Sequence, residues 1–189
     1  SENTAVGANA AGAVSTGNAN VAVGHNSLLI ASTGYQNVAI GAYSLDAVTT
    51  AANNVAVGYN AGTAVSTGAA NTAVGAYALE DNSTGNNSVA IGNNALANNT
   101  TASGNTAVGK DALKLCSTGS GSTAVGIYAL DAITTGADNV AMGYAAGGAL
   151  TTTSQHVAIG NNALDARTAG GNCVSVGFSA GTNESIGVG

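Results

Sequence analysis

Apolar residues recur along this chain in one short motif that is repeated at a fixed period of seventeen positions. In each period a valine or threonine, then an alanine (a serine in the last repeat), then a valine, isoleucine or methionine precede a glycine, as in Val55-Ala56-Val57-Gly58. This alternation places Val55 and Val57 on one face of an extended strand, and Ala56 on the other face together with Asn54. The closing glycine occurs eleven times without a slip, at Gly7, Gly24, Gly41, Gly58, Gly75, Gly92, Gly109, Gly126, Gly143, Gly160 and Gly177. Self-similarity at a fixed period predicts a solenoid.

A repeat of this length is too short for a strand, a crossover helix and two loops, but it suits two short strands and two turns. We therefore predict an all-β protein, a parallel β-solenoid of about 11 coils, with residues 1–189 forming one repeat-array domain cut from a longer fibre protein. The β-branched residues are expected inside each coil. The leucine four residues after most of the glycines, as at Leu79 and Leu96, is the expected second core element.

Two turn positions differ in how strictly they require glycine. The eleven glycines that close the strands predict a positive φ or a close approach between backbones. A second turn reads Ser/Thr-Thr-Gly, as in Ser66-Thr67-Gly68, but Ala51, Ala102 and Thr153 replace its glycine, so this turn is sterically less demanding. The asparagine column that contains Asn54 predicts a ladder of stacked amides, and the threonine column from Thr16 to Thr152 predicts a ladder of hydroxyls.

The alanine within each strand bears on the oligomeric state. If the β-branched residues face inward, this alanine faces outward, where larger polar residues would be expected unless another surface lies against it. The predicted partner is an identical chain related by closed rotational symmetry. The alternative is an alanine column inside a flattened single-chain solenoid. The predicted inter-chain contacts are Ala22, Ala39, Ala56, Ala73, Ala90, Ala107, Ala124, Ala141 and Ala158.

Composition and charge narrow the function classes. Only 6% of the residues are charged, yet 45% are apolar and keep register in every repeat, which argues against disorder. The net charge is −6, with three basic residues spread along the chain, so nucleic acid is not an expected partner. No apolar run is long enough to insert this segment into a membrane. Cys116 and Cys173 lie more than three coils apart, too far to pair within one chain.

Candidate chemistry is sparse. Residues 177–181 match the Gly-x-Ser-x-Gly nucleophile elbow, but Gly58-Tyr59-Asn60-Ala61-Gly62 shows that the serine occupies a variable slot. His25 and His156 lie in different columns about eight coils apart, and the acidic residues follow no calcium-binding spacing. We therefore expect no catalytic residue, no metal and no cofactor. Residues 185–189 resemble a strand motif that follows Gly177 too early for a full repeat, which predicts a shortened coil or the start of another module.

The two positions after each closing glycine vary most. Variable side chains at a fixed place on a rigid scaffold are where contact residues would lie. The alternative is that these are tolerant turn-edge positions without a ligand. The candidate surface contacts are Tyr43, Tyr59, Tyr77, Tyr128, Tyr144 and Phe178.

The repeats resemble those of a known family. Residues 87–96, Asn-Ser-Val-Ala-Ile-Gly-Asn-Asn-Ala-Leu, resemble the head repeat of trimeric autotransporter adhesins (YadA-like heads), and residues 71–79 and 105–113 are similar to repeats of phage tail fibres. The resemblance spans essentially the whole chain. It implies a left-handed β-roll, a side-by-side homotrimer, and a place outside the cell, on a bacterial surface or a virion fibre. The period of seventeen is longer than in the adhesin heads, which favours the fibre-type relatives.

The function expected from this resemblance is a structural and adhesive extracellular fibre segment. A rigid trimeric rod would present a surface for attachment, with a host-surface glycan or protein as its possible partner. Two alternatives stay open at this point: a filament formed by end-to-end stacking of coils, and an ice-binding solenoid that uses the threonine ladder.

Overall fold

The computed structural model describes residues 2–166 and 172–182. Its described part is all β, with eleven strands of three residues and no helix. The predicted strand-like segment at 185–189 lies outside the described residues. The strands are β1 (Thr4–Val6), β2 (Val21–Val23), β3 (Val38–Ile40), β4 (Val55–Val57), β5 (Thr72–Val74), β6 (Val89–Ile91), β7 (Thr106–Val108), β8 (Thr123–Val125), β9 (Val140–Met142), β10 (Val157–Ile159) and β11 (Val174–Val176).

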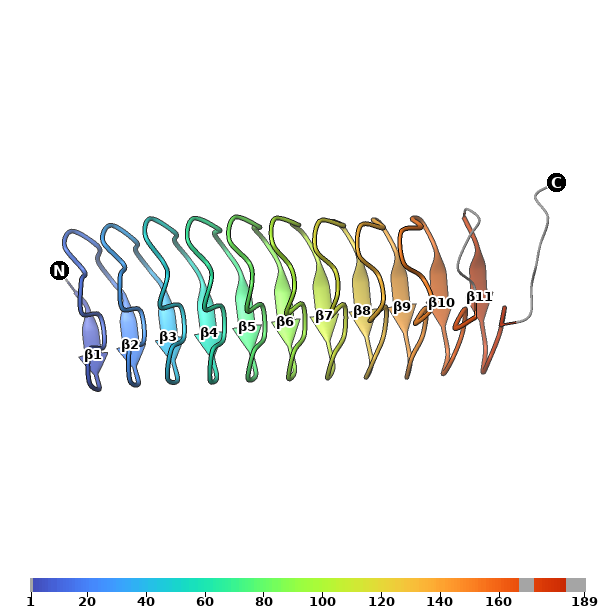
Figure 1. Ribbon diagram of the computed structural model, residues 1–189, viewed down its shortest axis with the longest axis horizontal. Helices are drawn as coiled ribbons and strands as arrows, with labels where there is room; N and C mark the ends of the chain where they lie inside the picture. The colour runs from blue at the N-terminus through green and yellow to red at the C-terminus, as the bar shows by residue number, and fades with distance from the viewer. Residues whose placement is uncertain (1, 167–171, 183–189) are drawn as a thin grey trace.

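The eleven strands form one parallel sheet in sequence order, from β1 to β11 (Figure 1). Each strand pairs with the next exactly one repeat later, so that Ala56 lies beside Ala73 and Ala73 beside Ala90. The result is a β-solenoid with one coil per repeat, which confirms the predicted fold class. Ten steps at the inter-strand spacing of about 4.8 Å give a sheet roughly 48 Å long, with β1 and β11 at its two ends.

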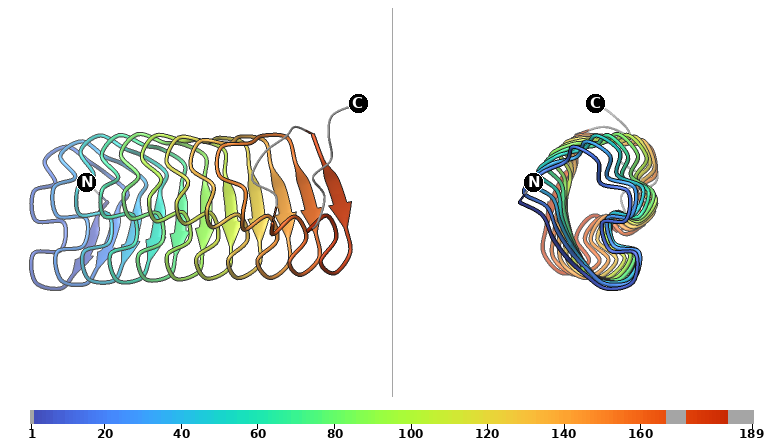
Figure 2. Two further views of the ribbon diagram at one scale, coloured as in Figure 1. Left: turned by 45° about the vertical axis from the view of Figure 1, so that its right-hand side comes forward. Right: turned by 90° about the vertical axis from the view of Figure 1, so that its left-hand side faces the viewer.

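The coils are held together on more than the strand side. Backbone N–H groups donate to the next coil from the strand (Val55 to the Asn71 carbonyl, 2.9 Å) and from the leucine side (Leu79 to the Ala95 carbonyl, 2.9 Å). Viewed along the axis, successive coils lie over one another with a gradual rotation (Figure 2). Because these bonds repeat in every coil, most of the backbone is satisfied by its neighbours along the rod.

The orientation of the strands differs from the predicted one. The alternation of faces is confirmed, but alanine points inward and the β-branched residues point outward: Ala107 is 0% exposed within the single chain, whereas Ile40 is 40% exposed. The inward column is Ala22, Ala39, Ala56, Ala73, Ala90, Ala107, Ala124, Ala141 and Ala158. The prediction that these alanines pack against a sister chain is therefore wrong, and the alternative of an alanine column inside the coil is confirmed.

The physical reason for this orientation is the narrow interior of the coil. A methyl group placed on Gly62, in the leucine column, would lie 2.9 Å from Leu45 Cδ2 and 3.8 Å from Ala56 Cβ. Side chains that enter from the leucine side thus almost reach the strand opposite, and only a small residue fits there. β propensity favours valine and isoleucine in the strand, but the width of the interior decides which face they occupy.

Two further columns fill the interior. The leucines four residues after the closing glycine, such as Leu79 and Leu96, are buried, as predicted. A third column, seven residues after the glycine, was not recognised from the sequence because its members are chemically mixed. It includes Val48, Val65, Cys116, Ile133 and Leu150, all buried, with Asn82 and Asn99 in the middle of the run.

The leucine side of the coil is not a strand. Two strands per coil were expected, but the described residues contain only one, plus an isolated bridge between Tyr35 and Ala52. The reason is the backbone: Tyr77 and Leu79 have φ of 60° and 53°, in the left-handed region, where an extended strand cannot continue. The glycines at 62 and 147 in the leucine column also have positive φ. This conformation explains why glycine replaces leucine in some of the coils.

The closing glycines behave as predicted. Gly75 has φ of 131°, a conformation that side chains rarely adopt, and an added Cβ would lie 2.6 Å from the carbonyl oxygen of Gly92. Glycine is therefore required twice over at this column. At the second turn, Gly34 has no positive φ. An added Cβ on Gly34 would still lie 2.8 Å from the Ala51 carbonyl oxygen, so the second turn is less demanding in backbone conformation but not in space. The ordinary φ agrees with the alanine and threonine substitutions seen at that turn.

The asparagine column forms the predicted ladder and also closes the second turn. Asn37 Nδ2 donates to Asn20 Oδ1 at 3.3 Å, and the next amide repeats the contact at 3.2 Å. Asn54 Nδ2 also donates to the Gly68 carbonyl at 2.9 Å, and its Oδ1 accepts the Asn71 backbone N–H at 2.9 Å. Each buried amide thus ties its own coil together and joins it to the next one.

Candidate functional site

The aromatic residues predicted as surface contacts gather into two clusters on one edge of the rod. The first aromatic cluster runs through four consecutive coils, with rings that alternate between the first and the second position after the closing glycine. Its neighbouring ring centroids lie 5.2, 6.0 and 5.5 Å apart, all edge-to-face. The cluster consists of His25, Tyr43, Tyr59 and Tyr77.

The second aromatic cluster contains Tyr128 and Tyr144, with ring centroids 5.8 Å apart and the same edge-to-face arrangement. Lys110 extends this cluster by one coil, at the first position after its closing glycine. The Lys110 Nζ lies 5.7 Å from the centroid of the Tyr128 ring. Phe178 is 79% exposed and makes no ring contact with the residues that the structure describes. The structure thus brings five of the six candidate contacts together in two groups and leaves Phe178 apart.

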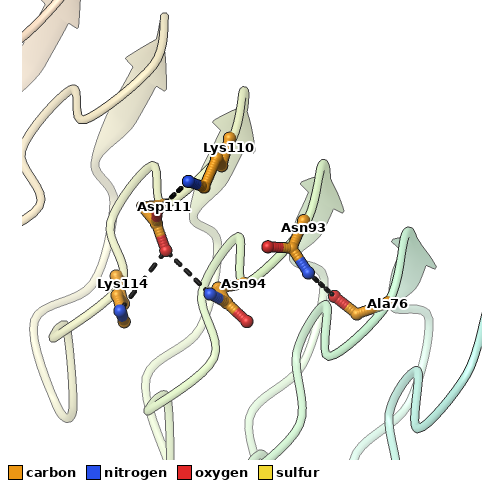
Figure 3. A network of polar contacts seen from close by, with 6 residues as sticks. All are labelled: Ala76, Asn93, Asn94, Lys110, Asp111 and Lys114. Atoms are coloured by element: carbon orange, nitrogen blue, oxygen red, sulfur yellow. Dashed lines mark hydrogen bonds and ion pairs between the residues drawn. The ribbon is translucent and has the colours of Figure 1, made fainter.

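Lys110, which contacts Tyr128 of the second cluster, also belongs to a network of charged and polar groups around Asp111 (Figure 3). Asp111 accepts a hydrogen bond from Asn94 Nδ2 at 2.8 Å and forms ion pairs with Lys114 at 3.4 Å and Lys110 at 3.6 Å. Burial alone would raise the pKa of Asp111, but the Asn94 hydrogen bond and the two ammonium groups hold it below its usual value. Contact with Tyr128, more than with Asp111, raises the pKa of Lys110. This carboxylate is therefore charged and neutralised by its own chain.

Two carboxylates near the first cluster, Asp46 and Glu80, are not neutralised in this way by any described residue. Burial raises the pKa of Asp46, against backbone N–H groups that lower it, and burial with the nearby Asp81 charge raises the pKa of Glu80. Within residues 2–166 and 172–182 the ion pairs all involve Asp111, so neither carboxylate has a cationic partner there. The Asn60 side chain lowers the pKa of Glu80, but by less than burial and the Asp81 charge raise it.

A hollow opens within the first cluster, with a volume of about 250 Å³. It forms because the coil of β4 carries the small Asn60 and Thr63 in columns where the coil of β3 carries Tyr43 and Asp46. The Thr63 hydroxyl donates to the Tyr43 carbonyl at 3.2 Å, which orients the Thr63 side chain. The lining residues are Tyr43, Asp46, Tyr59, Asn60 and Thr63.

The hydroxyl columns differ from the predicted ladder. Hydroxyl bonds between coils come from the column before the one that was predicted: Ser66 Oγ donates to the Ser83 carbonyl at 3.0 Å, and Thr100 Oγ1 to the Ser117 carbonyl at 3.1 Å. The column from Thr16 to Thr152 is exposed. An ice-binding surface needs at least two outward threonine columns, and here the hydroxyl hydrogens of the second column are bound to backbone.

Catalytic and metal chemistry find little support in the described ranges. They contain no group of three His, Cys, Asp or Glu side chains that could hold a metal ion. Ser179 of the elbow-like motif has φ of 49° in a turn, without the helix that such a motif needs. Cys116 and Cys173 are both free thiols, as their separation predicted, and burial raises the pKa of Cys116 to about 11.

The outward face of the sheet is the largest feature that the sequence reasoning placed wrongly. The last residue of every strand points outward and is aliphatic or methionine: Val6, Val23, Ile40, Val57, Val74, Ile91, Val108, Val125, Met142, Ile159 and Val176. We call this set, with the valines and threonines at the first strand position, the outer sheet face. The strict alternation of each strand was the signal, but only the width of the coil interior shows which side is outside.

Comparison of the chain with family models, with curated proteins and with solved structures finds no match. No helix in the described ranges is long and apolar enough to span a bilayer. The features of this protein that bear on function are the rod, its outer sheet face and its aromatic clusters.

Proposed function

We propose that this chain is a segment of an extracellular structural and adhesive fibre, a stiff β-solenoid rod that assembles side by side as a homotrimer. The rod would hold its aromatic clusters at a surface to which it attaches, on a bacterial cell or a virion. The observation that carries the proposal is the outer sheet face, a continuous apolar strip along the whole described array.

The size of the strip supports an interface. Three residues at about 3.3 Å and ten inter-strand steps at about 4.8 Å give a flat area of roughly 500 Å². The largest apolar patch of a typical monomer covers about 300–600 Å² and is often a binding surface, so a strip of this size is a candidate interface. Met142 is 49% exposed within this strip, although polar residues occur freely on the other sides of the coil. An identical rod placed alongside would cover it with matching periodicity.

Stiffness supports the structural part of the proposal. Each coil bonds to its neighbours through the backbone on both sides, and the buried asparagine ladder adds a side-chain link in most coils. Stability in such arrays is a sum over coils and nearest-neighbour interfaces, so a longer array is more stable. A rod of this kind suits a spacer that carries load outside a cell.

The proposal predicts a particle mass in solution three times the 17.8 kDa of a single chain. Sedimentation equilibrium measures this mass. Replacing Ile91 on the outer sheet face by lysine should shift the particle toward single chains, because the charge would be buried at the interface. The matched control is Thr84→Lys on the exposed threonine column, which should leave the mass unchanged.

Two results would contradict the trimer. One is a single-chain mass for the unmodified protein at concentrations up to the millimolar range. The other is a mass that grows without limit as the concentration rises, which would instead favour the filament formed by end-to-end stacking.

A further inference from the structure

The hollow in the first aromatic cluster combines aromatic rings with an acidic group in a way that the fibre function does not need. Tyr59 forms one side and is 47% exposed. Its ring meets Tyr43 at 88° and Tyr77 at 80°, so a ring edge contacts a ring face at each step. Exposed ring faces carry negative potential, which attracts cations.

The acidic groups of this region are placed by the repeat itself. In each described coil with tyrosine at the second position after the closing glycine, an acidic residue follows three positions later: Tyr43 with Asp46, Tyr77 with Glu80, and Tyr128 with Asp131. Asp46 lines the hollow, and Glu80 occupies the same column two coils further along the rod. Since neither has an ion-pair partner in the described part of the chain, the region has unbalanced negative charge.

The chain already shows how its scaffold holds an ammonium group. Lys110 occupies the column of Tyr59, and Tyr128 occupies the column of Tyr77. The Lys110 ammonium lies 5.7 Å from the Tyr128 centroid and 3.6 Å from a carboxylate oxygen of Asp111. A ring and a carboxylate on neighbouring coils of this fold can thus contact one primary ammonium group at the same time.

We propose that the hollow lined by Tyr43, Asp46, Tyr59, Asn60 and Thr63 binds an alkylammonium group, the chemical class of a lysine side chain on a partner surface. The two tyrosine rings contact the alkyl chain and the charged head, and the Asp46 carboxylate forms the ion pair. Asn60 and Thr63 keep the site open because they are smaller than the residues they replace. This inference rests on the proposed function, because it assigns a ligand class to the surface that the proposed fibre presents.

A titration with butylammonium chloride tests the site. The readout is the ring signals of ¹³C-tyrosine-labelled protein, followed by two-dimensional NMR. The signals of Tyr43 and Tyr59 should shift and saturate, and they should shift less as salt is added, because an ion pair is screened. 1-Butanol, a neutral molecule of the same size, should produce no saturable shift, and a linear β-glucan tetrasaccharide should also fail.

Variants separate the contribution of the Asp46 carboxylate from that of the Tyr59 ring. Asp46→Asn should weaken butylammonium binding about 3- to 10-fold, and Tyr59→Leu should do the same, whereas Tyr59→Phe should stay within about 2-fold because it keeps the ring face. Asp165→Asn is the matched control: Asp165 lies in the same column as Asp46, but its coil carries Asn162 in place of a tyrosine, so binding should be unchanged. Thermal unfolding of each variant checks that the coil is intact.

Three outcomes would overturn the inference: no saturable shift with butylammonium, equal shifts with butanol, or saturable binding of the tetrasaccharide instead. A parallel titration with tetramethylammonium chloride distinguishes a lysine side chain from a choline-type head group. Tetramethylammonium binding as tight as or tighter than butylammonium binding would favour the choline-type head group and would overturn the assignment to lysine. The mass of the same sample, measured by sedimentation, reports the trimer independently, so failure of the site is distinguishable from failure of the fibre proposal.

Discussion

Replacing Gly75 by alanine is expected to destabilise the array by about 3–5 kcal/mol. Gly75 has φ of 131°, and the new Cβ would lie 2.6 Å from the Gly92 carbonyl oxygen, which is backbone and cannot rotate away. The backbone of two coils would have to move apart, with loss of the hydrogen bond from the Gly75 N–H to the Val57 carbonyl at 2.8 Å. Urea unfolding followed by circular dichroism measures the change.

Gly104→Ala is the matched control for this substitution. Gly104 also has a positive φ, 70°, but it lies in the ordinary left-handed region and nothing lies within 4 Å of an added Cβ. Alanine there should cost only about 1–2 kcal/mol, the usual penalty for a left-handed residue. Equal losses for the two variants would show that the contact between neighbouring closing glycines is not what requires glycine at that column.

Replacing Ala107 by leucine is expected to cost about 3 kcal/mol or more, because three extra carbon atoms would enter a filled interior. Ala107 is fully buried in the single chain and lies between Ala90 and Ala124 in the sheet register. Thr101→Leu, in the exposed threonine column away from the outer sheet face, is the control and should stay within about 0.5 kcal/mol. Thermal unfolding of the two variants at equal concentration measures the difference.

This pair of variants also separates the two orientations of the strand. If Ala107 faced a sister chain, its replacement by leucine would leave each coil intact and change only the mass of the particle. A stable Ala107→Leu rod of lower mass would therefore contradict the inward alanine column. We expect the opposite, a loss of stability without a specific change in mass.

Periodicity made the architecture predictable from the sequence, because each feature that recurs once per repeat has to occupy an equivalent place in each coil. The parallel register, the closing glycines and the buried leucines all followed from that. The periodicity did not determine which face of the strand is buried inside the coil. Alternation defines two faces but does not say which is inside, and the strand residues Val55, Ala56 and Val57 fit either choice until the reach of Leu45 across the interior is known.

The left-handed residues carried a signal that could have been used. Position two after the closing glycine is often asparagine, as at Asn60 and Asn94, and the leucine column accepts glycine at Gly62. Asparagine and glycine are the residues that best tolerate a positive φ. Their presence in these columns indicates turns where a second strand was expected. Tyr77 and Leu79 adopt the same conformation, although tyrosine and leucine do not by themselves indicate a positive φ.

The aromatic candidates were predictable as variable surface positions but not as clusters. A ring at the first position of one coil meets a ring at the second position of the next, as for Tyr59 and Tyr77, because the coil offsets the two columns in space. Sequence columns treat these positions as separate. The hollow beside Tyr43 depends on the small residues Asn60 and Thr63, and their effect shows only when the neighbouring coils are in place.

The stacking of equal-length coils in register is the claim on which the rest depends, and distances between spin labels test it most directly. In a background of Cys116→Val and Cys173→Asn, residues that the same columns hold elsewhere, a label at Thr50→Cys is paired in turn with labels at Thr118→Cys, Thr135→Cys and Thr152→Cys. Labelled chains are diluted with unlabelled ones so that only distances within a chain are read by double electron–electron resonance.

We expect backbone separations of roughly 19, 24 and 29 Å for four, five and six coils, with narrow distributions and an equal increment of about 4.8 Å for each additional coil. Side-chain arms of the labels add the same offset to each pair, so the increment is the quantity to compare. Broad distributions, or distances that do not rise by equal steps, would contradict the stacked solenoid.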